Sequence, residues 1–315
     1  MKSNKEVKEA LLKLHFGVIL AGTSGLFGRW ITMSETLLSW YRVMFSLIIM
    51  LILLPLYRKI LRKIRKHSVA AAGGQKATKT DDKSGPLARL APYGIGVMLC
   101  FHWMFFFGSV KAANVSIAAV CLSLVPFITA ILEPILIRSP FVVMNFLYSI
   151  LSVLGVACIF GVDTQFRLGI FYGTLSSTLI ALMMIANKSM RSHKMASATL
   201  LYKELIGGTL AMTCVVALMK IGDPTMVITP SMSDLVCLVL LAAVVTIAPN
   251  LLKIQALAKV DAFTVNLVNN MEPVYSIILA IIIFNEAQQL SYAFVIGIVL
   301  ILASVLLQTR SMLRQ

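Results

Sequence analysis

Among the ionisable side chains inside long apolar stretches of the chain, five are the best placed to bind or move a charged group. They are Arg42, Glu133, Lys203, Glu204 and Glu272. A charged side chain is costly to bury in hydrocarbon, so it usually faces a cavity or a partner of opposite charge. These positions are therefore the first candidates for a functional site.

Arg42 is the leading candidate for contact with a substrate. Its planar guanidinium presents a rigid fork of N–H donors, which can bind an anionic group through parallel hydrogen bonds. The alternative is a structural role, in which Arg42 pairs with a carboxylate or with the last carbonyls of a helix. The sequence leaves both roles open.

The other four charged residues each have two competing interpretations. Glu272 falls near the middle of its apolar stretch, where a carboxyl group can exchange a proton with water or bond to a neighbouring helix. Glu133 falls nearer one end, so we expect it to reach water or to pair with Arg138. Lys203 and Glu204 are adjacent and point to different faces of one helix, where one of them can extend to the membrane surface. A transport role is open for both.

The predicted binding set also contains uncharged polar and aromatic residues. They are His102, Trp103, Asn250, Asn266, Asn269 and Asn270. The last three share one helical face by their spacing, and amides on a membrane helix either join helices or contact a substrate. For His102 and Trp103 the alternative is packing between helices.

Three prolines fall inside apolar stretches: Pro126, Pro249 and Pro273. Each lacks a backbone N–H, so each should kink its helix. We predict hinges at these positions, with tolerated kinks in a rigid bundle as the alternative.

Helices in a membrane must position all these residues. Apolar residues make up 59% of the chain and charged residues only 13%, so lipid is the solvent for most of it. Ten segments are each long enough to span a bilayer: 15–32, 36–57, 91–110, 115–137, 141–160, 168–187, 197–219, 234–257, 262–284 and 290–308. Without period-two alternation a barrel is disfavoured, so we predict an all-α integral membrane protein with ten transmembrane helices.

Basic residues are distributed unevenly between the loops, and this predicts the orientation. With the N-terminus inside, the outer loops receive only Lys111, Arg167 and Lys220, and the other loop cations lie inside. Both termini are therefore expected in the cytoplasm. Most of the net charge of +15 then reflects topology. The basic inner loop at 58–89 is predicted to be flexible and to contact anionic lipid headgroups rather than nucleic acid.

Two stretches of the chain resemble each other, namely residues 109–137 and 256–284. Pro126 aligns with Pro273, and Asn114 aligns with Asp261. Both stretches read as a short polar turn followed by a long apolar helix with a proline inside it. Such internal similarity is typical of transporters that are built from repeats.

The repeat divides the chain near the DTQFR turn into residues 1–163 and 164–315. Each part holds five predicted spans. Because five is odd, the second part must insert in the opposite direction, so the repeats are expected to be inverted. Inverted repeats place a binding site between the halves, near the middle of the bilayer.

The segment ALAKVDAFTVNLVNNMEPVYSIILAIIIFNE resembles a pattern found in EamA-type bacterial members of the drug/metabolite transporter superfamily. Glu272-Pro273 in mid-helix, Glu286 at its far end and Arg42 in the second span match that pattern, whereas Asn285 replaces the usual glycine. The resemblance implies a ten-helix bundle with a central cavity lined by the first four helices of each half.

These observations together predict a secondary transporter of the bacterial cytoplasmic (inner) membrane that works by alternating access. From the resemblance we expect export of a small polar or amphipathic metabolite, such as an amino acid or a related compound. Uptake or exchange of a nucleotide-like or sulfonium metabolite is the alternative. A homodimer is left open.

The sequence shows no phosphate loop, no metal cluster and no nucleophile beside a base. We therefore expect neither a metal nor a cofactor, and no enzymatic activity. An intramembrane enzyme is the remote alternative, because His102 has no acidic residue near it in its span.

Overall fold

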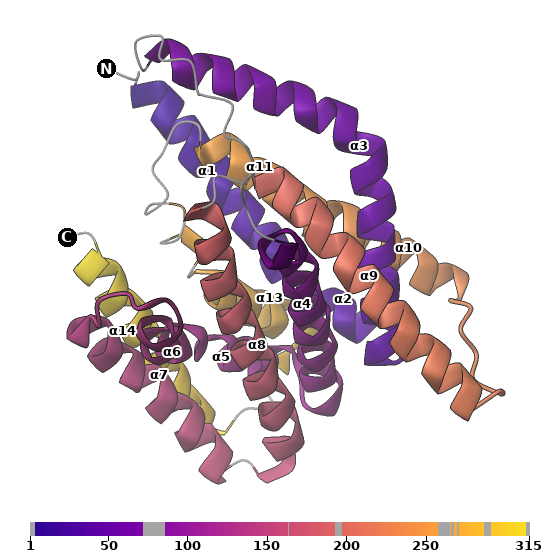
Figure 1. The fold of residues 1–315 in the computed structure, drawn as a ribbon. Coiled ribbons are helices and arrows are strands. Elements are labelled where there is room, and N and C mark those ends of the chain that lie inside the picture. The colour runs from indigo at the N-terminus through magenta and orange to yellow at the C-terminus, as the bar shows by residue number, and fades with distance from the viewer. Residues whose placement is uncertain are drawn as a thin grey trace.

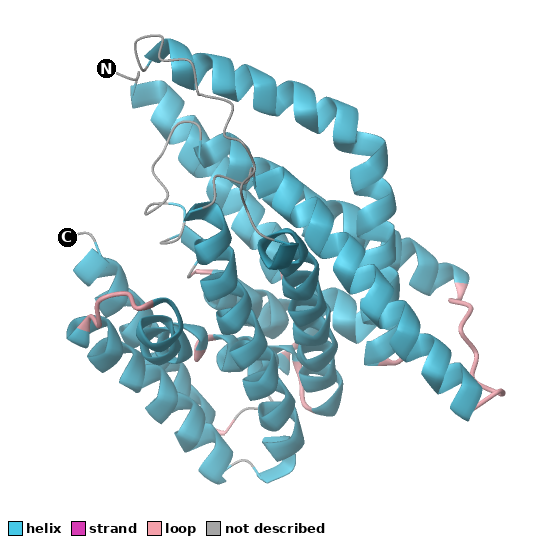
Figure 2. Cartoon of the chain, viewed as in Figure 1, coloured by secondary structure: helices cyan, strands magenta, loops and turns pink. Residues whose placement is uncertain are grey.

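The structure is a computed structural model of the chain. It describes residues 4–71, 86–162, 164–192, 197–257, 265, 268–269, 271–286 and 291–312. Every regular element in these residues is a helix, and Figure 2 shows the helices joined by loops.

The described part of the first half supplies seven α-helices. They are α1 (Asn4–Gly22), α2 (Ser24–Trp30), α3 (Glu35–Ala71), α4 (Pro86–Ala112), α5 (Val115–Leu122), α6 (Val125–Ile137) and α7 (Val143–Val162). The described part of the second half supplies the short 3-10 helix η1 (Thr164–Phe166), α8 (Arg167–Ser192), α9 (Ser197–Gly222), α10 (Met232–Leu240), the π-helix η2 (Leu241–Ile247), α11 (Ala248–Leu257), α13 (Glu272–Phe284) and α14 (Tyr292–Met312).

The apolar segments of the structure follow the ten predicted ranges. Within the described residues, seven helical stretches are long and apolar enough to cross a membrane: Val7–Trp30, Glu35–Leu53, Arg89–Ala112, Val115–Ile137, Thr164–Lys188, Thr199–Gly222 and Met232–Lys253. Three shorter apolar helices lie in the other ranges: Phe146–Gly161, Glu272–Phe284 and Tyr292–Ser304. The structure therefore supports an all-helical membrane protein, with seven helices of full spanning length in its described part.

The span at 115–137 is broken into two helices before Pro126. The Ser123 hydroxyl donates a hydrogen bond to the Val120 carbonyl at 2.6 Å, and the Leu124 amide donates to the Cys121 carbonyl at 3.0 Å. These tight bonds end α5, and Pro126 then lies in the first turn of α6, where a missing N–H costs least. The proline therefore starts a helix rather than kinking one.

Helix α13 repeats the local structure of α6 in the second half. Both helices have 13 residues and a proline in the first turn. The residues that follow them, Arg138 and Asn285, share φ 53° and ψ 35°, which is the left-handed conformation. Asparagine tolerates this conformation better than most residues, which explains how Asn285 replaces a glycine at this helix end.

The helices pair in the same way in the two halves. Helix α4 packs against α8 and α9, and the corresponding α11 and η2 pack against α1 and α3. Helix α5 packs against α13, and the two belong to the corresponding spans 115–137 and 262–284. Helix α7 packs against α14, and Figure 1 shows these two together at one edge of the bundle. Both chain ends lie on the same side, which we call the termini end. We call the opposite side the α2–α3 end.

Helices α4 and α9 approach each other closely because glycines face the contact. A Cβ atom built on Gly96 would lie 1.9 Å from the Glu204 carbonyl oxygen, and one on Gly207 would lie 2.1 Å from the Tyr93 carbonyl oxygen. A side chain at either position would collide with backbone. Small residues at helix contacts allow this approach in membrane proteins.

Candidate functional site

Arg42 lies in the core of the bundle and joins three helical elements. Its side chain is on α3, and the residue is only 5% exposed. Its Nη1 donates to the Ser24 hydroxyl of α2 at 2.8 Å, and its Nε donates to the Thr246 hydroxyl of η2 at 3.0 Å. Because Thr246 belongs to the second half, the guanidinium lies between the two halves.

Two aromatic rings of α4 hold the guanidinium from another side. The Arg42 Cζ lies 4.0 Å from the centre of the Trp103 ring and 5.5 Å from the centre of the Phe107 ring. Stacking on an indole face is the strongest form of cation–π contact and fixes the plane of the fork. We call Ser24, Arg42, Trp103, Phe107 and Thr246 the Arg42 cluster.

The π-helix η2 places Thr246 against Arg42. In an α-helix the Thr246 hydroxyl would bond to a carbonyl one turn before it, but here it donates to Leu241, five residues earlier, at 3.0 Å. That bond leaves the hydroxyl oxygen free to accept from Arg42. π-helical turns are rare and often occur at functional sites.

The Arg42 cluster holds a buried positive charge among neutral partners. In the described part of the chain, its hydrogen bonds go to hydroxyl groups, and it forms no ion pair. The carboxyl group of Glu272 is near enough for its charge to act on Arg42. Removing a charge from water costs free energy that only a counter-charge or several hydrogen bonds can offset.

Two serines extend the polar surface of α3 beside Arg42. Ser39 and Ser46 are fully buried, and their hydroxyls have no hydrogen-bond partner in the described structure. Residues 39, 42 and 46 share one helical face by their spacing. Unsatisfied buried hydroxyls next to a buried cation indicate a polar surface that an additional group could complete.

The other members of the predicted binding set are arranged differently. His102 is buried between α4 and α8, where its Nδ1 lies 2.8 Å from the Ser176 hydroxyl and 2.9 Å from the Ser176 carbonyl oxygen. Asn250 donates to the Thr246 carbonyl of its own helical turn at 2.8 Å. Asn269 is partly buried, and Asn266 and Asn270 lie outside the described residues. The geometry of His102 is that of a packing residue.

The charged candidates away from Arg42 lie at helix contacts. Glu133 pairs with Lys188 of α8, whereas Arg138 lies at the end of α6 in the left-handed conformation. The Lys203 ammonium lies 5.9 Å from the centre of the Tyr93 ring, and Glu204 is buried against α4. Glu272 is the first residue of α13.

The three predicted hinge prolines all lie in first turns of helices. Pro126 and Pro273 are second residues of α6 and α13, and Pro249 is the second residue of α11, directly after η2. All three therefore mark changes of helix, and Pro126 and Pro273 do so at corresponding places in the two halves.

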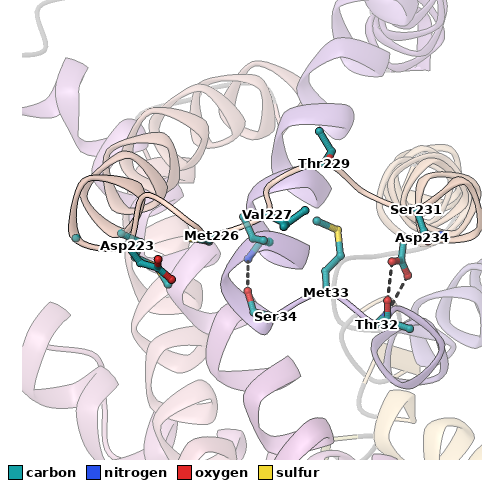
Figure 3. Close-up of a pocket in the computed structure, with 12 residues that line it drawn as sticks. Thr32, Met33, Ser34, Asp223, Met226, Val227, Thr229, Ser231 and Asp234 are labelled. Atoms are coloured by element: carbon teal, nitrogen blue, oxygen red, sulfur yellow. Dashed lines mark hydrogen bonds between the residues drawn. The ribbon is translucent and has the colours of Figure 1, made fainter.

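A cavity of about 660 Å³ opens at the α2–α3 end, between the α2–α3 turn and the α9–α10 loop. Figure 3 shows Thr32, Ser34, Asp223 and Asp234 around it. The Thr225 hydroxyl and amide donate to Asp223, and these hydrogen bonds hold the pKa of that carboxyl below its usual value. The Asp223 carboxylate on the cavity wall is accompanied by the Lys220 ammonium, which donates to the Met226 carbonyl at 2.6 Å.

Several residues of these sites were not among the sequence candidates. Ser24 and Thr246 are short hydroxyl residues in apolar helices, where they have no distinctive pattern. Asp234 falls at the edge of a span and reads as a surface residue, yet it is only 3% exposed. Its position after Ser231, which caps α10, was the one available signal for a helix start.

Comparison with known proteins relates the whole fold to a family. The model of the EamA-like transporter family matches residues 9–161 and 167–310. A solved crystal structure, titled only as that of a protein, is 17% identical, covers 98% of each chain and superposes with a TM-score of 0.57, a likeness of fold. None of the curated proteins compared matches the chain. Since the two matches cover nearly all of the sequence, the chain belongs to the EamA-like transporter family of the drug/metabolite transporter superfamily.

Proposed function

We propose that this protein is a secondary transporter that binds an anionic group of a small molecule at Arg42. The observation that carries the proposal is the buried guanidinium of Arg42, held between the halves by neutral partners. An arginine carries five N–H donors in a rigid fork. The N–H groups on Nη1 and Nε bond to Ser24 and Thr246, so the remaining N–H groups can bind the carboxylate of a ligand.

The aromatic and hydroxyl surroundings suit a small amphipathic substrate. Trp103 and Phe107 offer apolar faces next to the cation, and Ser39 and Ser46 offer hydroxyls that lack partners in the described structure. A zwitterion such as an amino acid combines these features, since its carboxylate would bind Arg42 while its apolar part contacts the rings. We therefore favour an amino acid or a related compound.

Transport would proceed by rocking the two halves around this site. The halves are proposed to be inverted repeats of five spans each, with both termini in the cytoplasm of a bacterial cell. The paired contacts α4–α8 and α1–α11 support that arrangement, and the uneven loop charges support that orientation. Export is the proposed direction, with uptake or exchange of a nucleotide-like or sulfonium metabolite as the alternative.

Comparative metabolomics tests the proposal. Cells expressing the wild type, Arg42→Gln or Arg167→Gln would be profiled in medium and cytosol. Arg167 is the matched control, because it is exposed at the start of α8. We expect one carboxylate metabolite to rise in the medium with the wild type and Arg167→Gln but not with Arg42→Gln. Equal profiles for all three proteins, at equal membrane abundance, would contradict the role of Arg42.

A binding measurement separates substrate recognition from direction. The purified protein would be heated with a panel of amino acids, organic acids and matched amides. A ligand stabilises the folded state by an amount that grows with its concentration relative to its dissociation constant. We expect an acid to raise the unfolding temperature, its amide to have no effect, and Arg42→Gln to lose the difference.

A further inference from the structure

Glu286 is a carboxylate with no solvent exposure at the α2–α3 end. Its Oε1 accepts from Arg29 Nη1 at 2.7 Å and from the Val115 amide at 3.2 Å. Its Oε2 accepts from the Ser116 amide at 2.9 Å. A single side chain that follows α13 therefore binds both α2 and the start of α5.

The start of α5 depends on this carboxylate. The first amides of a helix have no partner within the helix and carry partial positive charge. Glu286 satisfies those of Val115 and Ser116, and the Asn114 side chain accepts from the Ile117 amide at 2.8 Å. Because Glu286 belongs to the second half and α5 to the first, separation of the halves here would leave two amides unbonded.

Arg29 completes the contact from α2. Its Cζ lies 4.4 Å from the centre of the Phe284 ring, the last residue of α13, and its side chain is 37% exposed. The ion pair is thus reachable by water from one side, while the helix-capping bonds are sealed. We call Arg29, Val115, Ser116 and Glu286 the Glu286 clasp.

A second buried carboxylate joins the halves at the same end. Asp234 of α10 accepts from the Thr32 amide and from the Thr32 hydroxyl, both at 2.8 Å, and Figure 3 shows these bonds at the cavity wall. The Lys111 ammonium bonds to the carbonyl of Ile31 beside it at 2.9 Å. Two carboxylates of the second half, those of Glu286 and Asp234, therefore bind the segment 29–32 and the start of α5 of the first half.

The repeat offers no such carboxylate at the corresponding place in the first half. Asn285 corresponds to Arg138, so Glu286 corresponds to Ser139. A serine hydroxyl cannot form an ion pair. The ion pair that described residues form near that helix end, Glu133 with Lys188, has side chains 21% and 60% exposed, and exposed pairs contribute little.

We propose that Glu286 and Asp234 are gate residues that hold the α2–α3 end closed, and that transport requires both to release the first half. The role of this gate in transport rests on the proposed function, whereas the contacts that form the gate are independent of it. Without the two carboxylates, the repeated fold would allow either end of the bundle to open equally. The carboxylates shift this equilibrium towards the conformation in which the α2–α3 end is closed and the termini end is open. Release exposes the α5 amides to water, which can replace the carboxylate as acceptor.

Distance measurements across this end test the gate. Spin labels would be attached at Ser34→Cys in the first half and Thr229→Cys in the second, in a variant without the native cysteines. Both residues are exposed and lie on the cavity wall. Pulsed electron–electron double resonance on the labelled protein in liposomes, without substrate, would give the distribution of distances between the two labels. Short distances report the closed α2–α3 end, and long distances report the separated state. Three variants are expected to weaken the gate: Arg29→Gln, Glu286→Gln and Thr32→Val. Arg29→Lys is the control that keeps the positive charge of the ion pair. Lys188→Gln is the control at the termini end.

We expect Arg29→Gln to raise the separated population about fivefold, as loss of a partly buried ion pair would. Glu286→Gln should raise it at least as much and Thr32→Val less, while Arg29→Lys and Lys188→Gln should match the wild type. Unchanged distances in both Arg29→Gln and Thr32→Val would overturn the proposal, as would an equal change in Lys188→Gln.

The outcome is independent of the test of Arg42, because the labels report distances without substrate. Arg29→Gln is the informative variant if Glu286→Gln does not fold, since it removes the ion pair and keeps both helix-capping bonds. If Arg42→Gln abolishes transport while the gate variants leave the distances unchanged, the gate fails alone. If the gate variants shift the distances and no substrate is found, only the proposed function fails.

Discussion

The two ends of the bundle are built on the same helical pattern but are held together by different chemistry. At the α2–α3 end, the carboxylates of Glu286 and Asp234 are buried and bind backbone amides of the other half. At the termini end, Glu133 and Lys188 form a pair with partly exposed side chains. Among the described residues, repetition of the fold is therefore not accompanied by repetition of the contacts that join the two ends.

Helices α6 and α13 show how that difference arises. Their lengths, first-turn prolines and left-handed caps are the same. Their charges are not, because α6 starts with Val125 where α13 starts with Glu272, and Glu133 has Ala280 as its counterpart. The backbone of a repeat can thus persist while a few substitutions assign separate tasks to its copies.

The largest effect is expected from Glu286→Ala. This change leaves the Val115 and Ser116 amides and the Arg29 charge without their acceptor, so we expect the protein to lose about 3 kcal/mol of stability. Thermal unfolding in detergent would measure it, with Glu133→Ala as the matched glutamate at the other end. Equal losses for the two variants would remove the distinction between the ends.

Arg42→Ala should reduce transport about 10- to 100-fold, the range for one charge-assisted hydrogen-bonded contact. Folding should be retained, because its described hydrogen-bond partners are the hydroxyls of Ser24 and Thr246, which can bond elsewhere. Arg42→Lys should recover part of the rate, since it keeps the charge but not the fork. Initial rates in proteoliposomes would check this, and a wild-type rate for Arg42→Ala would place the substrate elsewhere.

Gly96→Ala tests whether the close backbone contact between α4 and α9, rather than charge, joins the halves away from the α2–α3 end. The new methyl group would collide with the Glu204 carbonyl, and we expect about 2 kcal/mol of destabilisation. Gly94→Ala is a close control, because nothing lies within 4 Å of a Cβ there. Equal unfolding temperatures for the two variants would show that α4 and α9 can separate without loss.

Glu272→Gln tests whether the second half alone carries a proton. The amide keeps the shape of the side chain but cannot titrate, so transport should slow by about threefold and respond less to pH. Rates across a pH series in proteoliposomes would show this. If Glu272→Gln keeps the wild-type pH profile, the carboxyl has a structural role, and the difference between α6 and α13 does not concern coupling.

The sequence predicted the helices, and it singled out Arg42 as a candidate, because both inferences depend on hydrophobicity and charge along the chain. Ten apolar segments and the aligned prolines follow directly from composition and spacing. The family assignment came from Glu272-Pro273, Glu286 and Arg42, and the family match confirms it.

The contacts between helices could not be predicted in the same way. In apolar helices every face looks similar, so the sequence does not fix how each helix is rotated. The π-helix that turns Thr246 towards Arg42 has no sequence signature, and Asn250 bonds within its own turn instead of facing a neighbour. The break before Pro126 likewise depends on the bond of Ser123 to its own helix.

The smallest effect is expected from Lys188→Gln, which removes the ion pair at the termini end. Its side chain is 60% exposed, and such pairs contribute about 0.5 kcal/mol or less because water and salt screen them. We expect no resolvable change in unfolding temperature, measured beside Arg29→Gln at the other end. If Lys188→Gln destabilised the protein as much as Arg29→Gln, exposure would not distinguish the two ion pairs. The difference between the ends would then rest on the helix-capping bonds of Glu286 and on Asp234, for which the described residues show no counterpart at the termini end.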